Sequence, residues 1–134
     1  MSVQTAQPFA TQSVAEIQAG LKAGEYSAKE IVDQSLERIE ALDPSIHAFL
    51  EVTADAAYEQ AKRVDEALAQ GTFDELGCLA GVPVAFKDNM NMVGTHTTCS
   101  SNMLANYVSP YTATCVERMI AAGALPLGKL NMDE

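Results

Sequence analysis

One lysine stands out because of the residues around it. Lys87 follows the apolar run of residues 82–86 and is itself followed by Asp88 and Asn89, two residue types that are common in loops. Burial lowers the pKa of a lysine, and a neutral amine is a usable general base. The sequence therefore allows two interpretations of Lys87. It is either a buried amine that does chemistry or a lysine at a strand end that reaches water or pairs with Asp88.

The polar segment 94–102 contains a second pair of possible reactive groups, His96 and Cys99. A thiol activated by a histidine is a common nucleophile. A spacing of three residues within a loop defines no activating geometry, and threonine and serine side chains in loops commonly satisfy backbone groups. We therefore interpret this segment as a structural loop. His47 is interpreted as a half-exposed structural residue on a strand.

The composition argues against several classes of protein. The 134 residues include 18 acidic and 8 basic side chains, a net charge of −10, which disfavours direct binding to nucleic acid or to an anionic membrane. No segment approaches the ~20 apolar residues that span a bilayer, and the N-terminus lacks a signal-peptide pattern. The three cysteines include no CxxC pair, so we expect neither a disulfide framework nor a metal site. A cytoplasmic location is expected.

Apolar periodicity predicts four helices. They cover about 13–23, 27–43, 54–70 and 112–122. Capping-box spacing begins the first two, at Ser13 with Glu16 and at Ser27 with Glu30. Several other residues are expected at helix ends: Asp43 and Pro44 ending the second helix, Thr53 capping the third and Gly71 ending it, and Thr112 or Thr114 capping the fourth.

Three strands are expected, two between these helices and one after the last helix, and residues 1–11 are expected to form a loose arm. Residues 46–52 alternate, with Ile46, Ala48, Leu50 and Val52 predicted to share the inward face. Residues 82–87 and 124–130 form the other two strands. Alternating helices and apolar strands predict an α/β domain with a mixed, partly parallel β-sheet flanked by helices.

Several motifs together resemble the amidase signature family. The segment 81–89 matches the family element G-V-P-x-x-x-K-D-N. The Thr97–Ser101 run, the Ser109–Tyr111 tripeptide and the GKLNMDE segment 128–134 resemble the tRNA-dependent amidotransferase branch of that family more than its general amidases. The resemblance extends over residues 12–134. It implies that residues 1–134 are the N-terminal portion of a single amidase domain.

The resemblance also implies a chemistry. Members of the family hydrolyse amides with a Ser–cis-Ser–Lys triad, and Lys87 matches its lysine, the base that deprotonates the bridging serine. The nucleophilic serine then attacks the carboxamide of glutamine and releases ammonia. Both serines follow the N-M-D-E motif in the family, whereas Ser100 and Ser101 match an upstream run. We therefore expect residues 1–134 alone to lack the nucleophile and to be inactive.

The same resemblance implies partners. A B subunit would bind tRNA and carry out ATP-dependent activation with Mg²⁺, and a small C subunit would brace the pair, so this chain would hold no cofactor and would meet tRNA only through the complex. Two alternatives stay open. One is a general amidase of the same family. The other is a non-catalytic module that binds a partner subunit through its N-terminal helices.

The charge balance predicts that this chain does not bind tRNA tightly by itself. A fluorescence titration with tRNA at about 50 and about 200 mM salt should show no saturation at micromolar concentrations, because an acidic surface repels phosphates. Nanomolar binding that weakens steeply with salt would contradict this prediction.

Overall fold

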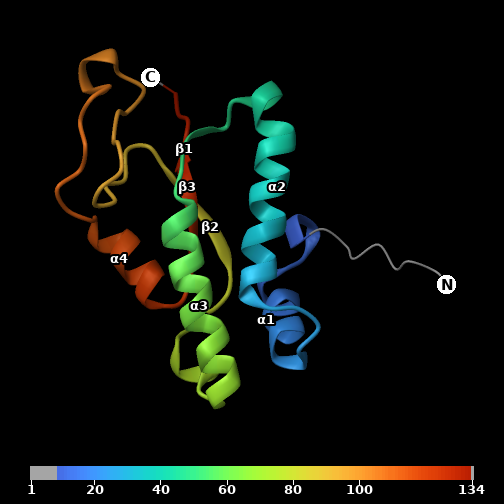
Figure 1. Ribbon diagram of the computed structural model, residues 1–134. Helices are drawn as coiled ribbons and strands as arrows, with labels where there is room; N and C mark the ends of the chain where they lie inside the picture. The colour runs from blue at the N-terminus through green and yellow to red at the C-terminus, as the bar shows by residue number, and fades with distance from the viewer. Residues whose placement is uncertain (1–8, 134) are drawn as a thin grey trace.

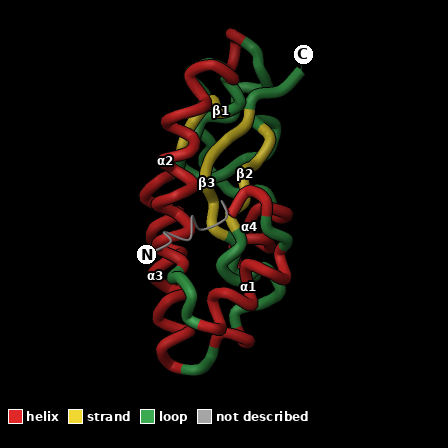
Figure 2. The backbone as a smooth tube through the Cα atoms, turned by 90° about the vertical axis from the view of Figure 1, so that its right-hand side faces the viewer, coloured by secondary structure: helices red, strands yellow, loops and turns green. Residues whose placement is uncertain are grey.

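The structure, a computed structural model, describes residues 9–133 and contains a three-stranded mixed sheet in the order β1-β3-β2. The central strand β3, Leu125–Leu130, pairs antiparallel with β1, Phe49–Val52, and parallel with β2, Pro83–Lys87. Figure 2 shows the three strands side by side. The predicted α/β class and the partly parallel sheet are confirmed.

Within residues 9–133, four α-helices accompany the sheet: α1 Val14–Ala23, α2 Ala28–Ile46, α3 Ala54–Gln70 and α4 Thr114–Ala121. Helices α2 and α3 pack against each other, and both contact β3 (Figure 1). Short 3₁₀ turns occur at Phe9–Thr11, Phe73–Glu75 and Asn102–Leu104. No helix within residues 9–133 combines the length and the apolar character needed to cross a membrane.

The first two helices begin where the sequence predicts. The side chains of Ser13 and Ser27 each accept a hydrogen bond from the backbone amide of the third helical residue, Glu16 or Glu30. The carboxylate of that glutamate in turn accepts a hydrogen bond from the backbone amide of the serine. Helix α3 also has its predicted bounds, and Gly71 ends it in the left-handed conformation. These ends were predictable because they depend on local hydrogen bonds. The predicted cap at Thr53 is wrong, because its hydroxyl donates to the Pro126 carbonyl oxygen at 2.8 Å and not to the helix.

The end of α2 was predicted wrongly. The helix continues through Pro44, and His47 caps it in the left-handed conformation at φ 57° instead of lying on a strand. Proline at this position removes one helical hydrogen bond, yet the helix continues to Ile46. The carboxylate of Asp43 accepts hydrogen bonds from the amides of Ala48 and Phe49 at 2.7 and 3.2 Å. Asp43 therefore helps the chain to turn after Ile46, three residues later than the predicted helix end at Asp43.

The inward face of β1 was also predicted wrongly. Leu50 and Val52 are 48% and 43% exposed, whereas Phe49 packs against the main core and Glu51 is half-buried. The strand carries apolar residues on both faces, so alternation alone does not say which one is covered. Packing of α2 and α3 decides it by covering the face that holds Phe49.

Two terminal segments also differ from expectation. Phe9 is buried and contacts Tyr26 edge-on at 4.6 Å between ring centroids, so residues 9–11 are not a loose arm; residues 1–8 lie outside the described part. Helix α4 begins after Ala113, without a side-chain cap. The hydroxyl of Thr112 instead accepts a hydrogen bond from the amide of Val93 at 3.0 Å.

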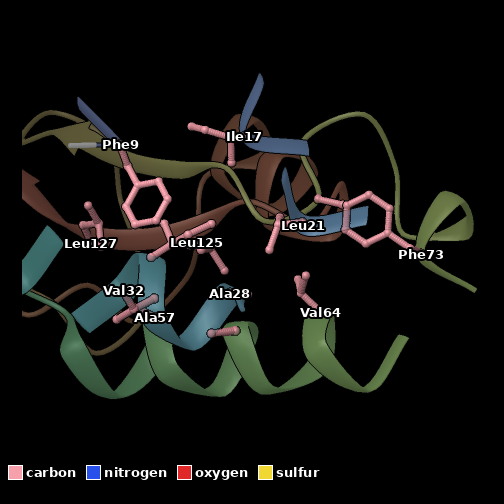
Figure 3. Close-up of a cluster of buried hydrophobic side chains, with 13 residues drawn as sticks. Phe9, Ile17, Leu21, Ala28, Val32, Ala57, Val64, Phe73, Leu125 and Leu127 are labelled. Atoms are coloured by element: carbon pink, nitrogen blue, oxygen red, sulfur yellow. The ribbon is translucent and has the colours of Figure 1, made fainter. Parts of the chain in front are cut away.

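The main core lies among α1, α2, α3 and β3 (Figure 3). Leu21, Ile31, Val64 and Leu125 are almost fully buried there. Each such side chain contributes about 1.5–3 kcal/mol relative to exposure. A smaller cluster around Phe86, Met92 and Val116 joins β2 to α4. These two clusters hold β2 and β3 in place, and they thereby restrain the positions of the residues at the ends of those strands.

A close backbone approach joins the end of α4 to the start of β2. Gly123 has φ 93°, its carbonyl oxygen accepts a hydrogen bond from the Gly81 amide at 3.0 Å, and a Cβ atom there would lie 2.6 Å from Ala80 Cα. Gly71 also has a positive φ, of 73°, but a Cβ atom there would meet no other atom within 4 Å.

We predict that Gly123→Ala lowers the free energy of unfolding by about 2–4 kcal/mol, because it adds a backbone clash to the strain of a positive φ. Gly71→Ala is the matched control and should cost only about 1 kcal/mol. Urea unfolding monitored by circular dichroism measures both values. Equal losses in the two variants would contradict the packing explanation.

Candidate functional site

The polar residues of interest meet where β2 and β3 end. These strands are parallel, and Lys87 at the end of β2 lies opposite Leu130 at the end of β3. Carboxyl ends of parallel strands are where ligand sites commonly form. The loop between β2 and α4 folds back over this edge, and the segment that follows β3 ends beside it (Figure 1). We call the following residues the strand-end cluster: Lys87, Asp88, Thr97, Thr98, Ser100, Lys129 and Asp133.

A fully buried ion pair lies at the centre of this cluster. The ammonium group of Lys129 donates to Asp88 Oδ1 at 3.0 Å, and the two side chains are 0% and 1% exposed. The same ammonium donates to the carbonyl oxygen of His96 at 2.9 Å and to Thr97 Oγ1 at 3.2 Å. All three ammonium hydrogens of Lys129 therefore have protein acceptors, which offsets much of the cost of burying the charge.

The carboxylate of Asp88 is equally well satisfied. Its second oxygen, Oδ2, accepts the backbone amide of Thr98 at 2.9 Å and also the Thr98 hydroxyl, through a short hydrogen bond. Burial alone would raise the pKa of Asp88, but the hydrogen bonds from Thr98 and Lys129 together hold this pKa below its ordinary value. Asp88 is thus ionised in the folded chain over the neutral pH range.

Lys87 occupies the opposite face of the strand from Asp88, as alternation along β2 requires. Its side chain is 46% exposed, and its ammonium group lies 3.2 Å from Asp133 Oδ1. Lys87 is therefore not the buried amine that one interpretation required, and it does not pair with Asp88, which pairs with Lys129. It is a strand-end lysine that reaches water, as the other interpretation allowed. The hydrogen bond from Lys87 lowers the pKa of Asp133 below its ordinary value.

The loop that closes the cluster has an unusual backbone. Cys99 and Ser100 have φ values of 48° and 56°, which side-chain-bearing residues seldom adopt. The Cys99 amide donates to the Asp88 carbonyl oxygen at 3.3 Å, and Ser100 Oγ donates to the Met132 carbonyl oxygen at 2.9 Å. Such conformations cost about 1–3 kcal/mol each and persist only where surrounding bonds impose them. The loop is thereby attached to the ends of both strands.

His96 and Cys99 are not assembled into a nucleophilic pair. Both the amide and the Nδ1 atom of His96 contact Glu51 Oε2, at 2.8 and 3.2 Å. This geometry agrees with the interpretation of residues 94–102 as a structural loop. The same loop, including His96, forms one wall of an open groove of about 620 Å³. Glu51 and Asn131 line the groove from outside the loop.

Residues 9–133 offer no cluster of three or more histidine, cysteine, aspartate or glutamate side chains for a metal ion. A larger hollow of about 1010 Å³ lies between α2 and β2, and Lys87 does not line it. The candidate site is the strand-end cluster, because it holds Lys87 and the buried ion pair at the carboxyl ends of two parallel strands.

Lys129 and its partnership with Asp88 were missed at the level of sequence. The available signal was the same one that singled out Lys87: a lysine inside an apolar strand, here LPLGKL. Sequence alone does not say which of two such lysines is buried, since each lies near a strand end. The parallel pairing of β2 with β3 places Lys129 over Asp88.

Comparisons with known proteins agree with this α/β framework and these motifs. The sequence profile of the Amidase family matches residues 30–134, and the chain belongs to this family. The chain is 54% identical over 122 residues to the A subunit of glutamyl-tRNA(Gln) amidotransferase from Synechococcus sp. (strain WH7803), and 48% identical over 122 residues to that from Carboxydothermus hydrogenoformans. These matches cover 91% of this chain and 25% of each relative, so the chain spans about a quarter of the length of the curated relatives it matches.

Solved structures show the same fold. The peptide amidase of Stenotrophomonas maltophilia superposes with a TM-score of 0.86 at 35% identity, over 95% of this chain and 26% of that one. A bacterial aryl acylamidase of the amidase signature family gives 0.81 at 29% identity, over 90% of this chain and 25% of that one. The predicted membership of the amidase signature family and its mixed sheet flanked by helices are confirmed. The role of Lys87 stays a prediction.

The pKa of Asp88 predicts a specific pH dependence of stability. The pKa of Asp88 is lower in the folded chain than in the unfolded chain, where it is about 3.9. Ionised Asp88 therefore stabilises the fold at pH values above the unfolded pKa, and this stabilisation is lost as the pH falls through the folded pKa. Asp88→Asn should therefore show a free energy of unfolding that falls less steeply than the wild type between about pH 4 and pH 2. Leaving Lys129 buried and unpaired should also cost about 3–5 kcal/mol at neutral pH.

Urea unfolding at a series of pH values measures both effects. Asp74→Asn is the control, because Asp74 forms only an exposed pair with Lys22, and it should keep the wild-type pH dependence. Parallel curves for the wild type and Asp88→Asn would show that the buried pair does not titrate as described.

Proposed function

We propose that this chain functions as part of the A subunit of a tRNA-dependent amidotransferase. In this proposal the whole protein hydrolyses glutamine, and the ammonia converts Glu-tRNA(Gln), or Asp-tRNA(Asn), to its amidated form. The observation that carries the proposal is the 54% identity to the A subunit of a glutamyl-tRNA(Gln) amidotransferase over 91% of this chain. The peptide amidase and the aryl acylamidase are less similar, at 35% and 29% identity.

Lys87 is the proposed base. Its amine lies at a strand end, half-exposed, beside the segment that leaves β3, and it is therefore open to groups contributed from outside the cluster. A neutral Lys87 amine would accept the proton of a bridging serine, which in turn would deprotonate the serine that attacks the glutamine carboxamide. Both serines are supplied, in this proposal, by a part of the protein outside residues 1–134. The chain alone should therefore hydrolyse no amide.

The proposal assigns the remaining steps to partners. A B subunit would activate the tRNA-linked carboxylate with ATP and Mg²⁺, and a C subunit would brace the assembly. This division agrees with the acidic balance of the chain, whose net charge of −10 suits contact with other proteins better than direct contact with tRNA.

A general amidase is the second candidate, because the peptide amidase and the aryl acylamidase share this fold at TM-scores of 0.86 and 0.81. A substrate panel separates the two. Hydrolysis of glutamine that increases in the presence of partner subunits and charged tRNA supports the amidotransferase, whereas efficient hydrolysis of peptide or aryl amides supports the amidase.

We predict that Lys87→Ala in the complete A subunit lowers glutamine-dependent amidation by about 10²–10⁴-fold, because the serine relay loses its base. Lys87→Arg should fail as well, since a guanidinium stays protonated. Amidation supplied with ammonium should survive in both variants, because it bypasses glutamine hydrolysis. Paired assays with glutamine and ammonium as nitrogen donors measure the two reactions.

Lys62→Ala is the matched control for these variants. Lys62 lies on α3 with its side chain 78% exposed and 4.0 Å from Glu66, and its replacement should leave both reactions unchanged. Glutamine turnover near the wild-type rate in Lys87→Ala would remove Lys87 from the mechanism and leave it as a structural residue at a strand end.

A further inference from the structure

Lys129 is buried at the centre of the strand-end cluster, and its ammonium group bonds both the residue that follows β2 and the loop that covers the strand ends. Its three hydrogen bonds go to Asp88 after β2, to the carbonyl oxygen of His96 and to the hydroxyl of Thr97. Lys129 itself belongs to β3. A single buried charge therefore joins the ends of two strands to the loop that covers them.

Asp88 transmits this restraint to its neighbour Lys87. Its backbone amide donates to the Leu130 carbonyl oxygen at 3.0 Å, its own carbonyl oxygen accepts from Cys99, and its carboxylate binds Lys129 and Thr98. Every hydrogen-bonding group of Asp88 is thus occupied. The backbone that carries Lys87 is held on its C-terminal side by a residue that cannot turn without breaking a buried ion pair.

The other side of the Lys87 contact is held through the loop. Ser100 Oγ donates to the carbonyl oxygen of Met132 at 2.9 Å and to Asn131 Oδ1 at 3.3 Å. Met132 directly precedes Asp133, the partner of Lys87. Because Lys129 fixes residues 96 and 97 of the same loop, it restrains both members of the Lys87–Asp133 pair.

We infer that Lys129 is a positioning residue: through its buried pair with Asp88 it sets the direction of the Lys87 amine relative to the segment 131–133. The inference rests on the proposed function for the catalytic use of Lys87. Lys129 itself is 0% exposed, and all its hydrogens are taken up by protein acceptors, so it does not reach a substrate. Its effect on the reaction acts through Lys87.

The first experiment uses the 134-residue chain and needs no activity. Lys129→Met should speed backbone amide exchange at Thr98 and Cys99 by about tenfold or more, because their acceptors on Asp88 are no longer anchored. It should also raise the pKa of the Asp133 carboxyl group, measured by carbon NMR, toward its ordinary value. Lys87→Met should do the same directly, because it removes the hydrogen bond between Lys87 and Asp133. Lys62→Met is the matched control and should change neither quantity.

A double variant keeps the test decisive if Lys129→Met fails to fold. Asp88→Asn/Lys129→Met removes both buried charges, so it should recover much of the lost thermal stability. The inference requires that the pKa of Asp133 in this double variant nevertheless stays near its ordinary value. A double variant with recovered stability and wild-type exchange and titration would overturn the inference, since the pair would then only stabilise the fold.

The second experiment measures glutamine hydrolysis by the complete A subunit in its complex. The double variant should lower kcat by about 10–100-fold while KM for glutamine changes by less than about twofold, because a misplaced base impairs the chemical step and not substrate binding. A kcat within about twofold of the wild type would overturn the inference, provided that Lys87→Ala is inactive. Full activity in Lys87→Ala would instead remove Lys87 from the proposed mechanism, and the NMR experiment would still decide whether Lys129 positions the Lys87 amine.

Discussion

The buried ion pair between Lys129 and Asp88 is the interaction on which the strand-end cluster depends. Removing two charges from water costs several kcal/mol per ion, and close pairing offsets this cost only when the remaining hydrogen-bonding groups are also satisfied. Here Thr97, Thr98 and the His96 carbonyl oxygen satisfy them. The pair therefore requires the loop to fold over it, and the loop requires β2 and β3 to end at the same edge.

Alternation along β2 then separates two roles. Asp88 faces inward and serves as an anchor, whereas Lys87 faces outward, where its amine stays accessible. Two adjacent residues thus provide a buried anchor and a half-exposed amine that pairs with Asp133. The K-D-N motif that links this chain to the amidase family places the lysine and the aspartate on opposite faces, because successive side chains of an extended chain alternate.

Much of the helical framework was predictable because its signals are local. Ser13 and Ser27 cap helices through residues three positions ahead, and Gly71 ends α3 without tertiary help. The errors arose where distant residues intervene. Asp43 moves the end of α2 by binding later amides, and the packing of α2 and α3 selects which face of β1 is buried.

The sequence by itself determined the helices with strong caps, the strand that ends at Lys87, the α/β class and the amidase motifs. Only the tertiary structure decided which lysine is buried and which is accessible. Lys87 and Lys129 lie in similar apolar runs, and their local patterns do not distinguish them. The difference comes from the parallel pairing of β2 and β3, which places Lys129 within reach of a carboxylate 41 positions away and leaves Lys87 on the opposite face.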